Sequence, residues 1–145
     1  MNVIYPRYDS SECTCARRVL VVDGEEELTT MLRLALEREG YDVEAVGAVK
    51  EALCKPLDDY GLFIVDMKMD NMQGLDFARS LRNRPETSAT PIIICSTMDN
   101  DRDIVDGLDA GADDYISPSI SVPTFLARVH SLMRRHYSRR QSVRG

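Results

Sequence analysis

The sequence lacks any segment that could anchor it in a membrane or direct it to secretion. No apolar run approaches the ~20 residues that a membrane-spanning helix needs. Residues 1–11 contain no hydrophobic stretch typical of a signal peptide. These absences argue against the membrane and secreted classes, so we expect a soluble cytoplasmic protein.

Cysteines suited to a metal site or a disulfide framework are also missing. Of the four cysteines, Cys54 and Cys95 lie in apolar surroundings, where a thiol usually packs as a small hydrophobe. Cys13 and Cys15 form a single CxC pair with no second pair of ligands. We therefore predict neither a structural metal nor a disulfide, which fits a reducing cytoplasm.

Positive charge is scarce except at the carboxyl end. The chain carries a net charge of −6, but residues 134–145 hold five arginines and no acid. The remaining 13 basic and 24 acidic residues give the preceding part of the chain a charge of −11. Because such a surface repels nucleic acid, we predict no DNA binding by this chain alone.

The composition is that of one ordinary globular domain. The chain has 145 residues, of which 43% are hydrophobic and 29% charged, and a chain of this size buries roughly two thirds of its unfolded surface. We assign residues 18–135 to one domain. Residues 1–17 are expected to be a flexible arm and residues 136–145 a basic tail or linker.

Short apolar runs alternate with helical patterns five times along the chain. The runs have little polar alternation, which is typical of strands covered by helices on both faces of a parallel sheet. They span residues 19–22, 43–46, 62–65, 92–95 and 115–116. The alternation predicts a doubly wound α/β fold. If the strand order is 2-1-3-4-5, as in the flavodoxin-like arrangement, strands 1, 3 and 4 are adjacent and their ends can form one site.

Apolar stripes mark the helices, and we expect these stripes to face the core. The first helix is the clearest, with acidic residues in its first turn and Gly40 just past its end. The stripes are Leu28, Met31, Leu32 and Ala35; Leu75, Ala78 and Leu81; Ile104, Val105 and Leu108; and Phe125, Leu126, Val129, Leu132 and Met133.

Polar side chains follow three of the predicted strands directly. Asp23 and Asp66 each come after a valine, and Ser96 and Thr97 follow Cys95. In an open α/β sheet, ligands bind at this carboxyl edge of the strands. Each residue alone could simply cap the next helix. Together they favour phosphoryl chemistry, in which one carboxylate attacks phosphorus, carboxylates hold Mg²⁺ and a hydroxyl bonds the transferred group.

A flavin-binding protein of the flavodoxin type is a poorer alternative. Such a protein needs a loop rich in hydroxyl groups and glycine to hold the flavin phosphate. No such loop follows Val22.

Five ordered segments of the chain resemble the signature blocks of response-regulator receiver domains. They are VLVVDGEEEL, YGLFIVDMKMDNMQGLDFARSLR, PIIICST, GLDAGADDYIS and LARVHSLMRR, and together they cover roughly residues 19–135. The resemblance implies a (βα)5 fold and a role in a phosphorelay. The implied partner is a histidine kinase or a phosphotransfer protein, and the implied cofactor is Mg²⁺.

The resemblance also implies roles for individual residues. Asp66 matches the phosphoacceptor, and Asp23 matches one of the two acids of the metal site. Ser96 matches the switch hydroxyl and Tyr115 the switch aromatic. Lys68 lies two residues beyond the acceptor, where the backbone carbonyl is a metal ligand and the side chain influences dephosphorylation. The domain is then a signalling module whose only chemistry is its own phosphorylation.

Two positions depart from the family pattern. Gly24 stands where a second acid usually follows the first, so we expect weakened Mg²⁺ binding. The lysine after the fifth strand is missing. An ungapped alignment puts Pro118 there, and a one-residue gap puts Ser117 there. Loss of this ammonium removes a charge-assisted bond that helps to couple phosphorylation to the switch.

Four charged residues match positions that receivers of the winged-helix transcription-regulator class use in a symmetric dimer. They are Asp113, Asp114, Arg128 and Arg134, on the face formed by the fourth helix, the fifth strand and the fifth helix. Ordinary surface charges are the alternative. No winged-helix sequence follows, so the chain could be an excised regulatory domain or a stand-alone receiver.

Two functional hypotheses remain open. In the first, the protein accepts a phosphoryl group on Asp66 and switches its partner or dimer contacts. In the second, it is a pseudo-receiver that binds other proteins without phosphorylation. Asp23, Asp66 and Ser96 favour the first hypothesis, whereas Gly24 and the missing lysine favour the second.

Overall fold

The computed structural model describes residues 17–144, apart from the side chains of residues 70–72 and 137–144. The predicted arm therefore lies outside the described residues except for its last position. The elements, in order, are β1 (Arg18–Val22), α1 (Glu26–Arg38), β2 (Asp42–Val46), α2 (Val49–Ala52), the 3-10 turn η2 (Leu57–Asp59), β3 (Leu62–Val65), α3 (Met69–Asn83), β4 (Ile92–Cys95), α4 (Asp101–Asp109), β5 (Asp114–Ile116) and α5 (Val122–Arg144).

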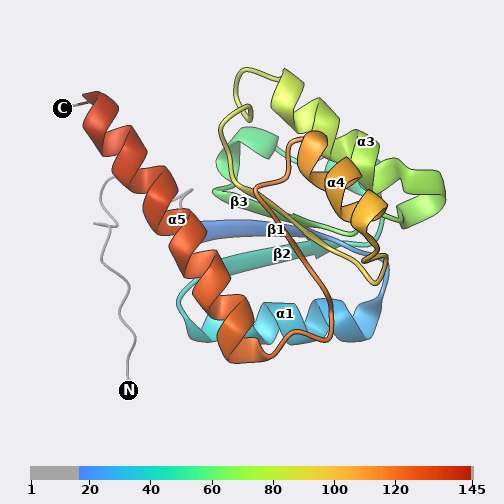
Figure 1. Ribbon diagram of the computed structural model, residues 1–145. Coiled ribbons are helices and arrows are strands. Elements are labelled where there is room, and N and C mark those ends of the chain that lie inside the picture. The colour runs from blue at the N-terminus through green and yellow to red at the C-terminus, as the bar shows by residue number, and fades with distance from the viewer. Residues whose placement is uncertain (1–16, 145) are drawn as a thin grey trace.

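The five strands form one parallel sheet in the order β2-β1-β3-β4-β5, which confirms the predicted topology. In Figure 1, α1 and α5 lie on one side of the sheet, and α3 and α4 lie on the other. The two strands of each neighbouring pair are parallel, in β1–β2, β1–β3, β3–β4 and β4–β5. Their carboxyl ends therefore meet at one edge of the sheet.

The core has two halves, one on each face of the sheet. In β1, Val19 and Val21 pack with the residues of α1 and α5, whereas Leu20 and Val22 pack with those of α2 and α3. All four side chains are fully buried. Residues 19–22 of β1 and all residues of β3 and β4 are apolar and buried, because helices cover both faces of the sheet there.

The first helix follows its sequence pattern closely. Leu28, Leu32 and Ala35 are buried against the sheet, and Met31 is partly buried beside them. Gly40 has a φ of +94°, a conformation that costs glycine little and that ends a helix. The predicted end of the helix is therefore confirmed by the backbone.

Two of the three residues in the apolar stripe of α4 face outward, and the prediction that Val105 and Leu108 are core is wrong; Ile104 is half-buried. Val105 and Leu108 are 53% and 43% exposed. The buried side of α4 carries Gly107 instead, and a Cβ atom there would lie 2.8 Å from two ring carbons of Tyr115. The helix thus packs through a glycine on an aromatic ring, and the side chains of Val105 and Leu108 remain on the surface.

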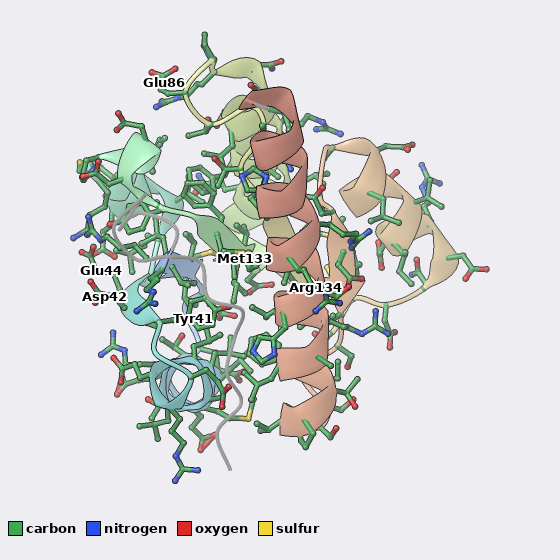
Figure 2. All side chains as sticks on the ribbon, turned by 90° about the vertical axis from the view of Figure 1, so that its left-hand side faces the viewer. Tyr41, Asp42, Glu44, Glu86, Met133 and Arg134 are labelled. Atoms are coloured by element: carbon green, nitrogen blue, oxygen red, sulfur yellow. The ribbon has the colours of Figure 1, made fainter. Side chains whose placement is uncertain are left out.

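Helix α5 continues through the segment for which the sequence predicts a tail or linker. Its backbone is helical from Val122 to Arg144. Met133 is buried and Arg134 is exposed, and Figure 2 shows Met133 on the sheet side of α5 and Arg134 on its outer surface.

Among the described residues, no helix is long and apolar enough to cross a membrane.

The guanidinium group of Arg82 binds several segments next to the amino ends of β4 and β5. Arg82, near the end of α3, donates to the backbone carbonyls of Thr87, Ser88, Thr90 and Gly111 at 2.6–3.3 Å. It also pairs with Asp113 at 2.7 Å, and the same carboxylate oxygen accepts the N–H of Ile92 at 2.9 Å. Arg82 therefore joins α3, the connection to β4 and the connection between α4 and β5.

Candidate functional site

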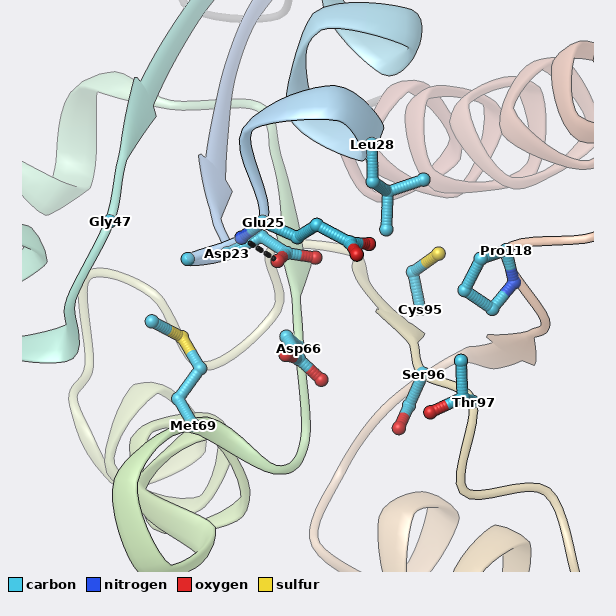
Figure 3. Close-up of a pocket in the computed structure, with 11 residues that line it drawn as sticks. Asp23, Glu25, Leu28, Gly47, Asp66, Met69, Cys95, Ser96, Thr97 and Pro118 are labelled. Atoms are coloured by element: carbon cyan, nitrogen blue, oxygen red, sulfur yellow. Dashed lines mark hydrogen bonds between the residues drawn. The ribbon is translucent and has the colours of Figure 1, made fainter.

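A pocket of about 470 Å³ lies at the carboxyl edge of the sheet. It is shown in Figure 3 and is built from the ends of β1, β3 and β4 together with the connections after β2 and β5. Its lining consists of Asp23, Gly24, Glu25, Leu28, Gly47, Asp66, Met69, Cys95, Ser96, Thr97 and Pro118.

The strand register brings the predicted polar residues together. Val22 pairs with Val65, so Asp23 and Asp66 are the next residues on two neighbouring strands. The N–H of Asp66 donates to the Val22 carbonyl at 2.9 Å, and the N–H of Ser96 donates to the Ile116 carbonyl at 3.1 Å. The hydrogen bonds between strands therefore fix the backbone positions of Asp66 and Ser96.

None of these residues is the N-cap of the following helix, so the capping alternative does not explain them. The N-cap of α1 is Glu25 and that of α3 is Lys68, and neither makes a side-chain capping bond. The N-cap of α4 is Asn100, whose side chain accepts the N–H of Asp103 at 2.9 Å.

The two aspartates lie in a poorly solvated site. Asp23 is only 6% exposed, and burial, together with the nearby charges of Asp66 and Glu25, raises its pKa to about 6, although a bond from the N–H of Glu25 opposes this. Burial also raises the pKa of Asp66, against the N–H and the positive charge of Lys68. Nearby carboxylates of this kind are stabilised by a cation.

The donor set fits a magnesium ion that keeps several of its waters. Mg²⁺ prefers oxygen ligands in near-octahedral geometry and commonly uses only one or two carboxylates. Asp23 and Asp66 offer these carboxylates, and Gly24 adds none. Within the part of the chain that the structure describes, no three His, Cys, Asp or Glu side chains are grouped to hold a metal. Waters would therefore have to complete the coordination.

The pocket contains a proline ring where the resemblance leads one to expect an ammonium group. Pro118 lines the pocket. Ser117 instead forms a local turn, because its Oγ accepts the N–H of Ser119 at 3.2 Å and lies 2.9 Å from the Ser119 Oγ. Of the two alignments that the sequence left open, the ungapped one identifies the residue that reaches the pocket.

The main chain of Met98 links the two candidate switch residues. Ser96 is 2% exposed, and its Oγ accepts the N–H of Met98 at 3.1 Å. The hydroxyl of Tyr115 donates to the carbonyl of Met98 and also contacts the Met67 sulfur at 3.2 Å. Burial raises the pKa of Tyr115, although a hydrogen bond with Ser96 opposes this. Ser96, Met98 and Tyr115 thus form a connected path from the pocket to α4.

The four residues predicted for a dimer face are not gathered into one cluster. Asp113 is held by Arg82, and Asp114 pairs with Arg128 of the same chain at 3.1 Å. Arg134 is exposed on α5. The charges of Asp113 and Asp114 are therefore already paired within one copy of the protein.

Sequence reasoning missed residues that act through the backbone. Gly74 in α3 lies so close to the acceptor that a Cβ atom there would be 1.8 Å from the Asp66 carbonyl oxygen. The bonds of Met98 to the site also use main-chain atoms. A glycine inside a predicted helix is the only sequence signal of this close approach, because main-chain contacts leave no mark on residue type.

The chain is similar to known proteins over most of its length. A family model described as the response regulator receiver domain matches residues 19–130. The phosphate regulon transcriptional regulatory protein PhoB of Rhizobium meliloti is 38% identical over 121 residues, which are 81% of this chain and 52% of the relative. The response regulator ArlR of Staphylococcus saprophyticus is 37% identical over 119 residues, 81% of this chain and 53% of the relative.

The chain thus spans about half the length of the curated relatives that it matches. Among solved structures, the chemotaxis protein CheY4 of Vibrio cholerae matches with a TM-score of 0.73 and 26% identity. That match covers 79% of this chain and 97% of the other chain.

Proposed function

The chain belongs to the response regulator receiver domain family, and on that premise we propose that Asp66 accepts a phosphoryl group from a histidine kinase or a phosphotransfer protein. One observation carries the proposal. Two carboxylates and the hydroxyl of Ser96, which follow three separate strands, converge on one pocket at the edge of the sheet where ligands bind. Residues 18–135 form the receiver, a signalling domain rather than an enzyme with a separate substrate.

In the proposed reaction, a carboxylate oxygen of Asp66 attacks phosphorus. The bond from phosphorus to the donor's imidazole nitrogen breaks, and its electron pair stays on that nitrogen. Mg²⁺ would be held by Asp23, Asp66 and the backbone carbonyl of Lys68. When bound, it would neutralise part of the phosphoryl charge. Ser96 stands where its hydroxyl can donate to a phosphoryl oxygen.

Mg²⁺ binding is weaker in this chain than in a site with two adjacent acids. Gly24 leaves a coordination position to water, which weakens the site without abolishing it. The backbone at Gly24 leaves space for a Cβ atom, which would meet only the Gly47 carbonyl oxygen at 3.4 Å. The weakening therefore arises from a missing charge and not from a blocked site.

The switching signal passes from Ser96 to Tyr115 through Met98. If the Ser96 hydroxyl turns toward a phosphoryl group, it gives up its bond from the Met98 N–H. The Met98 carbonyl holds the Tyr115 hydroxyl, so a shift of this segment moves the ring that supports α4. The response is smaller than in a complete site, because no ammonium after β5 joins in.

A second copy of the chain is the proposed partner of the face formed by α4, β5 and α5. The outward stripe of α4, which includes Val105 and Leu108, supplies apolar area that exposed ion pairs do not. Asp114 and Arg128 lie on the same face and could exchange their bond within one chain for bonds between two chains. Asp113 is less available, because Arg82 holds it.

The phosphoacceptor proposal is tested by intact mass after a brief incubation with Mg²⁺ and a small phosphodonor. We expect the wild type to gain the mass of one phosphoryl group slowly and only at high Mg²⁺ concentration. Asp66→Asn should gain none. Ser96→Ala should still be labelled but should respond less, as measured by amide exchange in α4.

A pseudo-receiver is the second candidate, and two observations favour it. The pocket carries Gly24 and Pro118 at the two departures from the family pattern. Tyr115 packs under Gly107 and its hydroxyl is bonded to Met98, an arrangement that uses only groups of the chain itself. If wild type takes up no phosphate at any Mg²⁺ concentration, and Asp66→Asn keeps its partner contacts, this second function holds.

A further inference from the structure

The hydroxyl of Tyr115 lies where two segments of the chain meet. It donates to the carbonyl of Met98 and makes a hydrogen bond with Ser96, and both of these residues belong to the segment after β4. It also lies 3.2 Å from the sulfur of Met67, which follows β3. Of these three contacts, the one to Met67 does not involve the segment after β4.

The position of Met67 is fixed by β1 and α3. Its side chain is fully buried in the half of the core that contains α3. The preceding residue, Asp66, donates its N–H to the Val22 carbonyl at 2.9 Å. On the other side, α3 approaches so closely that a Cβ atom at Gly74 would lie 3.0 Å from the Met67 Cα. A movement of the segment after β4 therefore need not displace the sulfur.

The Met67 sulfur can replace an acceptor that the Tyr115 hydroxyl loses. A phenolic hydroxyl has one proton to donate, and a thioether sulfur is a weak acceptor that also makes favourable contacts with aromatic rings. A half-buried hydroxyl that loses its acceptor pays the cost of desolvation without compensation. If the Met98 carbonyl moves away, the sulfur is already within reach of the same hydroxyl.

Resting on the switching role proposed above, we propose that Met67 is a positioning residue that keeps the Tyr115 ring beneath α4 when Ser96 and the Met98 carbonyl move. The other end of the device is Gly107, where a Cβ atom would lie 2.8 Å from two carbons of the same ring. The ring is thus held between α4 and the residue after β3. A movement of the segment after β4 is then passed to α4 only in part.

The test removes the sulfur alone and in combination with the Ser96 hydroxyl. Met67→Leu removes the acceptor at nearly constant volume. Met133→Leu is the matched control, because Met133 is 1% exposed and lies in the other half of the core. Each is made in wild type and in Ser96→Ala, which takes away the bond to Tyr115 and frees the Met98 N–H.

The position of the Tyr115 ring is followed by NMR of isotope-labelled tyrosine without a phosphodonor, and Tyr115→Phe identifies its signals. In wild type, Met67→Leu should displace the ring little, because Met98 still accepts the hydroxyl. In Ser96→Ala, Met67→Leu should raise the displaced fraction about two- to fivefold, the effect of one weak hydrogen bond. Met133→Leu should change the ring position in neither background.

A second measurement needs no substitution of Met67, so it decides the question even if Met67→Leu does not fold. With isotope-labelled methionine methyl groups, Tyr115→Phe should shift the signal of Met67 and leave that of Met133 in place. An unshifted Met67 signal overturns the inference, because the hydroxyl then does not act on the sulfur.

Two other results also overturn the inference. One is a ring position in Ser96→Ala that Met67→Leu does not change. The other is an equal effect of Met133→Leu, which would show a general loosening of the core. None of these measurements uses phosphate. The intact-mass experiment on Asp66 therefore decides the phosphoacceptor function separately.

Discussion

Asp23 should destabilise the metal-free fold at neutral pH, and replacing it with asparagine should reveal by how much. Asn is nearly the same shape, and its Oδ1 can still accept the N–H of Glu25, which now donates to Asp23 at 2.8 Å. The substitution therefore removes the charge and keeps the local turn. Any change in the free energy of unfolding reports mainly on the cost of burying the carboxylate.

The raised pKa gives the size and the sign of the effect. Folding moves the pKa of Asp23 from 3.8 to about 6, which corresponds to at most about 3 kcal/mol. Between these values the folded state holds a proton that the unfolded state has released. The contribution of Asp23 to the stability of wild type should therefore fall as pH rises from about 4 to about 6, and stay lower above that range. Water in the open pocket reduces the effect, so we expect about 1–3 kcal/mol.

Urea unfolding at several pH values measures this directly. At pH 7 without Mg²⁺, Asp23→Asn should be more stable than wild type by that amount, and at pH 3.5 the two should agree. Adding Mg²⁺ should stabilise wild type through mass action and should have little effect on the variant. Both proteins contain Asp66, so the difference between them removes the part of its titration that does not depend on the charge of Asp23.

Two results would refute the reasoning. If Asp23→Asn is less stable than wild type at pH 7, the carboxylate contributes more through its hydrogen bond than it costs through burial. If the variant is more stable by the same amount at every pH, the gain does not come from the charge. Either result would also remove the electrostatic reason for expecting a cation at this site.

Three other substitutions test separate parts of the structure. Gly24→Asp should tighten Mg²⁺ binding about tenfold or more by calorimetry, whereas Gly24→Asn should have a far smaller effect; equal affinities would show that a second carboxylate is not what the site lacks. Gly107→Ala should lower the free energy of unfolding by about 1–3 kcal/mol, because its methyl group would meet the Tyr115 ring at 2.8 Å. A gain in stability there, as helix propensity alone favours, would contradict the packing. Arg128→Glu should reduce self-association in light scattering, and an unchanged oligomer would exclude this face as the main contact.

The sequence predicted the sheet closely because each strand carries its own signal. Two runs match the observed strands at both ends, β3 and β4, and the other three strands begin one residue earlier than predicted. The first residues of these strands are Arg18, Asp42 and Asp114, which are polar and sit where the sheet meets solvent. Hydrophobicity cannot mark such positions, since it reports burial and not backbone pairing.

The prediction failed for α4 because an apolar stripe does not say which surface it packs against. Hydrophobic spacing placed Val105 and Leu108 toward the core, and the structure places them outside. What decides the packing is Gly107, whose missing side chain lets Tyr115 fit beneath the helix. A residue without a side chain makes no contribution to a hydrophobic pattern.

The candidate site was partly predictable for the same reason. Asp23, Asp66 and Ser96 could be placed because each follows a strand, and the ends of parallel strands meet. The bonds of Met98 and the contacts of Arg82 could not, since they run to backbone atoms of segments that are distant in sequence. Only the folded chain determines which carbonyls a guanidinium can reach.

The contacts of Arg82 have a consequence for how this edge of the sheet unfolds locally. Its acceptors lie in the connection from α3 to β4 and in the turn before β5, so detaching either segment breaks bonds to the same guanidinium group. The Ile92 N–H, held by Asp113, is the amide at the meeting point of these segments. Its hydrogen exchange should therefore report the local opening of this edge of the sheet.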